Sequence, residues 1–372
     1  MKKERIFLVF FCIILAVPLL FSDKVGGRVS ADENRYLAKF PELTLHAGIK
    51  KEFEDWINDN AAGRTYLRKI YNYANINLLK ARYDGVNLYE GDWVFLMNDI
   101  VTFYYLQKGD VMDQTRQETW IQDYKRVRDF LAQRHVSMCS VVYPHKSEVY
   151  AERFQDYIIP LSEKGQLDVF REMAESNPDL NMKVLYDLFK LKTDNGEQLY
   201  SKAYDHAHWN NQGAWLGYQE LMEMVQKEIP EVRILTETDV EISECERTSR
   251  YYGRTYTETD LEYKVREPQG TEDPSWFDSV GYESADQWKS YRYYKNKDGT
   301  LPKILIIGDS YTWMFMLPWI SESFSETVFI HEADSGNLNL MMDLLSPDIV
   351  VFAGLQNCVT NSVGNVASAI QY

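Results

Sequence analysis

The chain has 372 residues, 45% of them hydrophobic and 26% charged, and 40 Lys and Arg against 56 Asp and Glu give a formal net charge of -16. This length suggests two domains or one large, decorated α/β domain, and the apolar share excludes a mainly disordered chain. Such an acidic chain repels phosphate backbones, which excludes general nucleic-acid binding. The aromatic share of 14% is only a hint of sugar stacking, because aromatic side chains mostly fill cores.

The N-terminus predicts an export signal. Three basic residues precede an uncharged run from Ile6 to Phe21, which is the pattern of a basic n-region followed by an apolar h-region. The run is shorter than the roughly 20 residues that span a bilayer comfortably, but no good small-x-small cleavage site follows it directly. We expect residues 1–22 to be an uncleaved signal anchor rather than a cleaved signal peptide. The protein would then be single-pass, with residues 23–48 an extracytoplasmic linker; cleavage would make it secreted.

The hydrophobic pattern predicts one or two helices over 49–83, broken near Gly63, and a hairpin or two short strands over 85–96. From residue 113 helices and strands alternate, which favours a mostly parallel sheet. The predicted helices cover 113–134, 162–175, 212–226, 310–322 and 338–345, and the predicted strands cover 136–143, 182–186, 303–307, 327–330 and 348–352. Charged and aromatic sequence interrupts the pattern from about 230 to 302, and we interpret it as an insertion of extended segments and loops lying over the sheet.

The four cysteines indicate neither a disulfide framework nor a metal site. Cys12, Cys139, Cys245 and Cys358 are widely spaced and form no CxxC pair. Cys139 lies in the short apolar run 136–143, so we expect it to be a small core side chain of a buried strand.

Two short segments contain the residue types of nucleophilic catalysis. In ILIIGDSYTW, residues 304–313, an apolar strand runs into Gly-Asp-Ser where a helix should begin. Ligands of open α/β sheets bind at such an edge, and the N–H groups of a helix start favour an oxyanion, so Ser310 is a candidate nucleophile. The alternative is an ordinary Ser/Asp helix cap.

The second segment is YDHAHWNNQG, residues 204–213. A serine nucleophile needs a base of near-neutral pKa and a carboxylate that holds the imidazole tautomer, and His208 and Asp205 can supply both. Two alternatives remain open here. His206 and His208 form a His-x-His pair that suits zinc or copper, although no third ligand is evident, and a His-rich loop can simply precede a helix.

Together these segments resemble the SGNH hydrolase superfamily, and the order with Asp and His ahead of Ser resembles its permuted alginate O-acetyltransferase branch (AlgX/AlgJ-like and DHHW proteins). Further segments match motifs of that branch: ENRYLAKFPEL at 33–43, FEDWINDN at 53–60 with Arg64, GDWVF at 91–95, YPHK at 143–146 with Tyr150, and HWNNQGA at 208–214. The resemblance covers roughly residues 30–357. It implies an SGNH-hydrolase-like (flavodoxin-like) three-layer α/β fold, with residues 49–372 as the catalytic domain.

The resemblance also implies roles for individual residues. Ser310 would be the nucleophile and His208 the general base. The family usually places the aspartate two residues before that histidine, where this chain has His206, so Asp205 at a DxxH spacing is our expectation for the acid. Gly354 and Asn357 could complete an oxyanion hole or form an ordinary turn. Lys146 could pair with a substrate carboxylate, although we favour a structural role.

The function implied is extracytoplasmic O-acetyl transfer to a cell-surface or secreted polysaccharide through an acetyl-serine, without a cofactor or metal. A membrane-bound acyltransferase would deliver the acetyl group. The alternatives are a carbohydrate esterase of the same mechanism, a lapsed glycan-binding or scaffold protein, and a metal-dependent hydrolase using His206 and His208. Trp276 and Trp288 are candidate stacking platforms for the glycan, or anchors of the insertion onto the core.

Overall fold

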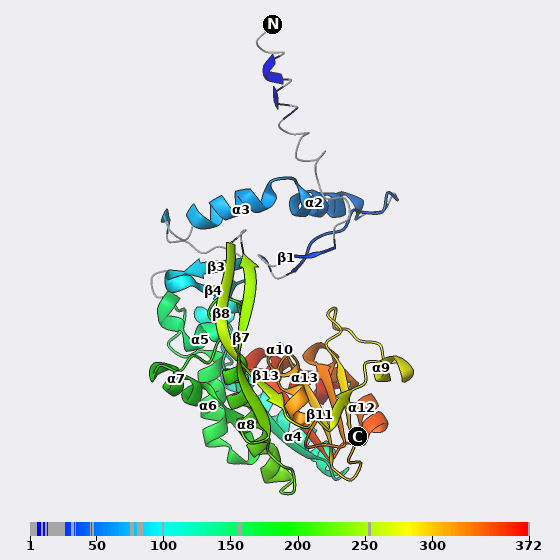
Figure 1. The fold of residues 1–372 in the computed structure, drawn as a ribbon. Helices are drawn as coiled ribbons and strands as arrows, with labels where there is room; N and C mark the ends of the chain where they lie inside the picture. The colour runs from blue at the N-terminus through cyan, green and yellow to red at the C-terminus, as the bar shows by residue number, and fades with distance from the viewer. Residues whose placement is uncertain are drawn as a thin grey trace. The chain divides into compact units, whose positions relative to one another are not determined.

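The computed structural model describes residues 6–8, 10–11, 13, 27–30, 33, 35–44, 46, 48–74, 78–79, 85–98, 100–154, 158–251 and 254–370. The chain divides into two compact units. Figure 1 labels many of their helices and strands. The first comprises Met1–Asp99, Lys202–His206 and Thr248–Thr257, and the second comprises Ile100–Ser201, Ala207–Arg247 and Glu258–Tyr372. This division differs from the expected domain boundary at residue 49, which stays a prediction.

Most of the expected signal segment, residues 1–22, lies outside the described residues. Within the described part of the chain, no helix has the length and apolar character needed to cross a bilayer. The anchor therefore stays a prediction.

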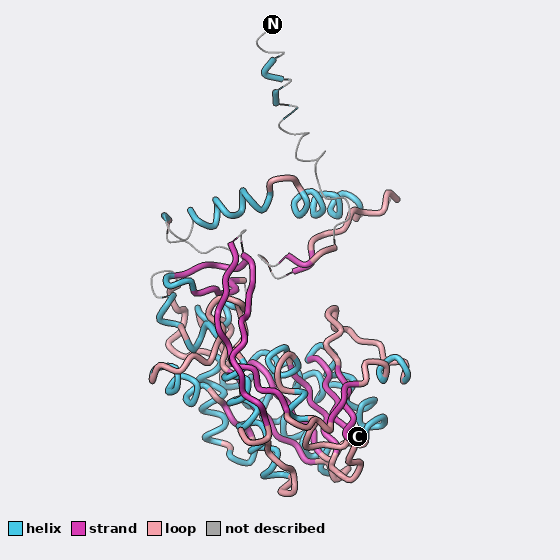
Figure 2. Tube along the Cα trace, in the orientation of Figure 1, coloured by secondary structure: helices cyan, strands magenta, loops and turns pink. Residues whose placement is uncertain are grey.

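The second unit is built on a sheet that, in the described residues, has seven strands in the order β6-β5-β13-β11-β12-β10-β9. Figure 2 draws strands in magenta. Neighbours among the first five strands pair in parallel, β10 pairs antiparallel with β12, and β9 pairs antiparallel with β10. The strands are β5 (Ser137–Tyr143), β6 (Met182–Val184), β9 (Gly270–Glu272), β10 (Arg292–Asn296), β11 (Lys303–Gly308), β12 (Glu326–His331) and β13 (Ile349–Leu355). The mostly parallel sheet is confirmed.

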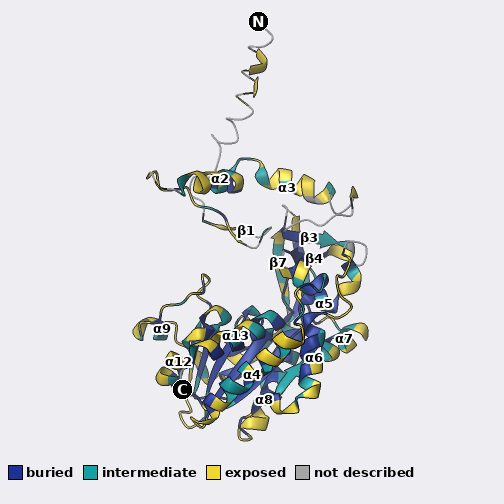
Figure 3. Ribbon diagram, turned by 180° about the vertical axis from the view of Figure 1, so that it is seen from behind, coloured by how far each residue is buried: buried dark blue, intermediate teal, exposed yellow. Residues whose placement is uncertain are grey.

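Helices cover both faces of this sheet. One face packs against α4 (Gln114–Ala132), α6 (Gln166–Ser176), α12 (Leu338–Leu345) and α13 (Gln356–Ala369), and the other against α8 (Asn211–Glu228) and α11 (Leu317–Ile320). Side chains alternate along the strands, so Leu305 and Ile307 enter the first of these cores while Ile304 and Ile306 point to the opposite face. Figure 3 shows the strands as the most buried part of the unit.

The structure corrects two expected elements in this unit. The helix expected over 310–322 is two short helices, α10 (Ser310–Trp313) and α11, because Pro318 lies at the start of α11 and has no N–H for a continuous helix. The strand expected over 182–186 ends at Val184, and the unpredicted α7 (Tyr186–Asp194) follows it.

The structure also corrects the expectation that the insertion at about 230–302 lies over the sheet, because part of it joins the sheet. β7 (Val240–Tyr251) and β8 (Arg254–Val265) form a separate two-stranded ribbon, and α9 (Trp276–Ser279) precedes β10. β9 and β10 extend the sheet itself, since β10 pairs with β12 along the hydrogen-bonding edge that β12 would otherwise leave open.

In the first unit, β3 (Gly85–Tyr89) and β4 (Trp93–Met97) form the expected hairpin. Its apolar core joins Val86, Val94 and Leu96 to Ala203, Tyr251 and Tyr256. The expected helical region is α2 (Ile49–Asn60) and α3 (Arg64–Tyr73), and the break falls at Gly63, whose φ of +81° favours glycine. The remaining short elements of the first unit are β1 (Val29–Ser30), β2 (Arg35–Tyr36) and η2 (Glu90–Asp92).

The remaining short elements of the second unit are η3 (Ile100–Leu106), α5 (Lys146–Val149), η4 (Ala151–Phe154), η5 (Pro178–Leu180) and η6 (Glu332–Asn337).

Candidate active site

Ser310 lies at the carboxyl edge of the parallel strands. β11 ends at Gly308, Asp309 caps α10, and the half-buried Ser310 is the first residue of that helix. One carboxylate oxygen of Asp309 accepts a hydrogen bond from the Tyr311 N–H (3.0 Å), and the other accepts one from the Leu355 N–H (2.7 Å). Asp309 therefore holds the serine turn to the end of the neighbouring strand β13.

Close packing surrounds this turn. A Cβ on Gly354 would lie 2.6 Å from Cys358 Sγ and 2.7 Å from Asp309 Oδ2, so only glycine allows the strand end to approach the turn. Burial raises the pKa of Asp309 to about 6, although the hydrogen bond from the Leu355 N–H opposes this shift. The turn is thus buried and closely packed, and Ser310 lies at its more exposed end.

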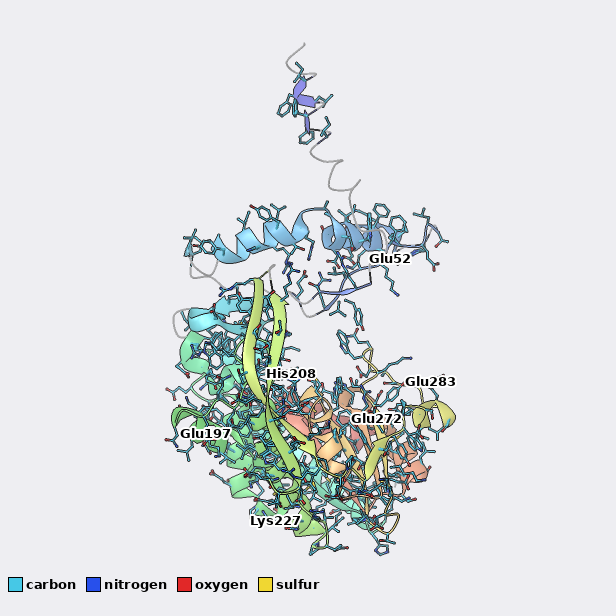
Figure 4. All side chains as sticks on the ribbon, in the orientation of Figure 1. Glu52, Glu197, His208, Lys227, Glu272 and Glu283 are labelled. Carbon is cyan, nitrogen blue, oxygen red and sulfur yellow. The ribbon has the colours of Figure 1, made fainter. Side chains whose placement is uncertain are left out.

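His208, labelled in Figure 4, lies in the loop before α8. Its Nε2 is 2.7 Å from Ser310 Oγ, a hydrogen bond between residues 102 positions apart. The cap of α8 is Asn210, whose side-chain oxygen accepts from the Gly213 N–H at 2.8 Å, so the imidazole is not needed for capping. The neighbouring Trp209 is fully buried. The described geometry therefore brings the candidate nucleophile and the candidate base into hydrogen-bond contact.

Tyr311 holds the histidine loop in place. Its hydroxyl donates to the carbonyl oxygen of Ala207 (2.6 Å) and accepts from the Lys146 N–H (3.3 Å). Its ring centroid lies 5.1 Å from that of His208 and 5.0 Å from that of Trp209. Lys146 is itself fully buried. The role of its side chain, structural or substrate-binding, stays a prediction.

The histidine loop also contains Asp205 and His206, both half-buried. They belong to the segment Lys202–His206, which is grouped with the first unit, so the pairing of Asp205 with His208 stays a prediction. His206 Nδ1 lies 3.3 Å from the Tyr251 hydroxyl. Within the described residues, no group of three or more His, Cys, Asp or Glu side chains could hold a metal ion.

Gly354 and Asn357, the candidate oxyanion residues, lie at the end of β13 and in the first turn of α13. Gly354 packs against Asp309, directly before the serine. Asn357 Oδ1 accepts a hydrogen bond from the Tyr105 hydroxyl at 2.5 Å. The ring of Tyr105 in turn stacks on His145, with centroids 4.6 Å apart. Close packing gives Gly354 a structural reason to be glycine, whatever its part in catalysis.

The two candidate stacking tryptophans differ in their surroundings. Trp276 stacks on Tyr293, with centroids 4.6 Å apart and an interplanar angle of 8°, and packs against the sheet core. Trp288 is 42% exposed. Trp276 therefore packs within the unit while Trp288 is partly exposed, and the role of each as a stacking platform or an anchor stays a prediction.

Sequence reasoning missed three contributions to this site. Tyr311, the cross-strand hydrogen bond of Asp309, and Tyr105 all act through contacts between residues far apart in the chain. The Gly-Asp-Ser pattern indicated a helix cap, but no local signal identifies a hydroxyl that will bond a distant backbone.

Comparison with known proteins identifies the family of the chain. Residues 89–342 match the family described as "SGNH hydrolase-like domain, acetyltransferase AlgX", and the chain belongs to that family. No curated protein matches the chain.

Among solved structures, PatB1 of Bacillus cereus is 13% identical with a TM-score of 0.50, covering 74% of this chain and 97% of its own. PatB1 with a sulfonyl adduct is 13% identical with a TM-score of 0.51, covering 74% and 95%. A DHHW family protein from Eubacterium siraeum DSM 15702 is 14% identical with a TM-score of 0.45, covering 75% and 94%. The PatB1 structures support the SGNH-like fold.

Proposed function

We propose that this chain is an extracytoplasmic O-acetyltransferase that modifies a cell-surface or secreted polysaccharide through an acetyl-serine at Ser310. The observation that carries the proposal is the 2.7 Å hydrogen bond between His208 Nε2 and Ser310 Oγ. Membership of the AlgX acetyltransferase family supports acetyl transfer as the reaction.

In the first half-reaction, Ser310 Oγ attacks the carbonyl carbon of an acetyl donor while His208 Nε2 takes the hydroxyl proton. The carbonyl oxygen becomes an oxyanion, and the Ser310 N–H is our candidate donor to it. The Tyr311 N–H is engaged with Asp309 and is not assigned this part. The leaving group departs with the proton from His208, and acetyl-serine remains.

In the second half-reaction, a sugar hydroxyl gives its proton to His208 and attacks the acetyl carbonyl. The second tetrahedral intermediate collapses, Ser310 recovers its proton, and the sugar carries the acetyl ester. Asp205 would stabilise the imidazolium in both steps. Water in place of the sugar would make the same site an esterase.

The proposed partners follow from this scheme. A polysaccharide supplies the acceptor hydroxyl, and a membrane-bound acyltransferase presents the acetyl donor. The net charge of -16 favours a neutral or amino-sugar glycan at least as much as a uronate polymer. Trp288, which is 42% exposed, is our candidate stacking surface for a sugar.

Intact-mass measurement of the full chain after incubation with p-nitrophenyl acetate tests the serine. We expect one acetyl group to be added, and we expect none in Ser310→Ala. Ser275→Ala, which changes an exposed serine at the start of the short helix α9, should be acetylated like the parent.

A sulfonyl fluoride is a second probe, suggested by the sulfonyl adduct of PatB1. An activated Ser310 Oγ would displace fluoride and form a sulfonate ester, which has no second half-reaction. Acetylation or sulfonylation that persists in Ser310→Ala would refute the assignment. No adduct in a folded parent chain would instead favour the lapsed glycan-binding protein.

A further inference from the structure

The helix α3 presents a continuous apolar face. Tyr66, Leu67, Ile70, Tyr71 and Tyr73 are between 50% and 67% exposed. At 100° per residue their positions occupy one arc of about 160° on the helix circumference. Two further apolar side chains, Leu78 and Leu79, follow the helix and are each 69% exposed.

The opposite side of α3 is tied to its own unit by ion pairs. Arg64 Nη1 and Nη2 donate to the two carboxylate oxygens of Glu33, at 2.5 and 3.0 Å, and Arg68 Nη1 lies 3.3 Å from the same carboxylate. Burial alone would raise the pKa of Glu33, but the hydrogen bond from Arg64 and the charge of Arg68 outweigh it and lower the pKa. The Arg64 and Arg68 edge of the polar side therefore contacts Glu33, while Thr65 and Lys69 on the same side are exposed.

This orientation reverses that of an ordinary surface helix, which turns its apolar stripe to the core. The five exposed side chains of α3 together present on the order of 600 Å² of mostly apolar surface, at the upper limit for a typical monomer. Figure 3 shows α3 mainly in the colour of exposed residues. Exposed apolar faces of this size mark interaction sites.

The chemistry of the face selects a lipid surface. Three tyrosines combined with Leu67 and Ile70 give the aromatic and aliphatic composition that lies at membrane interfaces. The same chain carries the uncharged run from Ile6 to Phe21 behind three basic residues. The net charge of -16 repels anionic lipids. The free energy of binding therefore has to come from insertion of the apolar side chains.

We propose that the apolar face of α3, formed by Tyr66, Leu67, Ile70, Tyr71 and Tyr73, lies in the interface of a lipid bilayer. The helix lies parallel to the membrane, with Lys69 and Thr65 on its water-facing side. This assignment is independent of the chemistry at Ser310.

The test uses the full chain reconstituted into vesicles of phosphatidylcholine and phosphatidylglycerol. A nitroxide label is attached to Ile70→Cys on the apolar face or to Lys69→Cys one position away on the polar side. Cys12 and Cys245 are first replaced by Ser, while Cys139 and Cys358 are buried and remain. Collision of the label with oxygen, which enters lipid, is compared with collision with a water-soluble nickel chelate.

We expect the ratio of oxygen to nickel collisions to be about 10-fold higher at Ile70→Cys than at Lys69→Cys, as for a helix immersed about 5–10 Å. Leu67→Cys and Thr65→Cys repeat the comparison one turn earlier and exclude a local effect of one label. Equal exposure of both faces to nickel would overturn the proposal. An Ile70→Cys label shielded from both reagents would also overturn it, because a protein surface would then cover the face.

Discussion

The change Tyr311→Phe removes one oxygen atom from the interior of the second unit and tests what holds the His208 loop. The hydroxyl makes hydrogen bonds to the Ala207 carbonyl oxygen at 2.6 Å and from the Lys146 N–H at 3.3 Å. Each such bond contributes about 1 kcal/mol net, so the free energy of unfolding should fall by about 2 kcal/mol. Because Ala207 directly precedes His208, acetylation of Ser310 should also slow by about 10- to 100-fold.

Urea unfolding and the rate of p-nitrophenyl acetate turnover measure the two effects, and the slope of the unfolding line should not change. Tyr143→Phe is the matched control. Tyr143 is also fully buried and its ring centroid lies 4.8 Å from that of Trp209, but among the described residues its hydroxyl makes only long contacts, 3.8 Å to Met316 Sδ and 3.5 Å to Thr312 Oγ1. We expect it to cost less than about 1 kcal/mol.

Two results would refute this reasoning. Equal losses of stability in the two variants would mean that the ring, and not the hydrogen bonds of Tyr311, matters. A Tyr311→Phe variant with the parental turnover rate would mean that the hydroxyl does not position His208.

Three further predictions concern the acid of the site, the half-buried carboxyl of Glu148 and a packed glycine. Asp205→Asn should lower the acetylation rate of Ser310 about 100-fold or more without changing the free energy of unfolding, because the amide cannot stabilise the imidazolium. The control His206→Asn should keep the parental rate, and a parental rate in Asp205→Asn as well would point to another acid. Burial raises the pKa of Glu148 from 4.5 to about 8, so its contribution to stability is complete below about pH 4.5 and is lost as the pH rises to about 8. In urea unfolding, the free energy of unfolding of Glu148→Gln should therefore rise by about 2–4 kcal/mol relative to that of the parent between about pH 5 and pH 8. A difference between the two proteins that does not change with pH would contradict the raised pKa. Gly354→Ala should cost about 1–3 kcal/mol through overpacking, while Gly364→Ala, at an open position of α13, should stabilise by up to about 1 kcal/mol; equal melting temperatures would refute this contrast.

Local patterns in the sequence determined much of the framework. Apolar runs of strand length located β5, β11 and β13, and helical periodicity located α4, α8 and α12, because these signals depend on neighbouring residues. The Gly-Asp-Ser turn and the His-Trp loop marked Ser310 and His208 in the same way, through residue types that suit nucleophilic chemistry. Their resemblance to the AlgX-like branch agrees with the family that the chain matches.

Only the tertiary structure brought His208 Nε2 to 2.7 Å from Ser310 Oγ, across 102 positions of the chain. It also placed β9 and β10 in the sheet and gave Tyr311 and Asp309 their backbone partners. It turned the Arg64 side of α3 towards Glu33 and left the apolar side exposed. These features depend on hydrogen bonds and ion pairs between distant segments, and residue order predicts local conformation far better than it predicts which distant groups will meet.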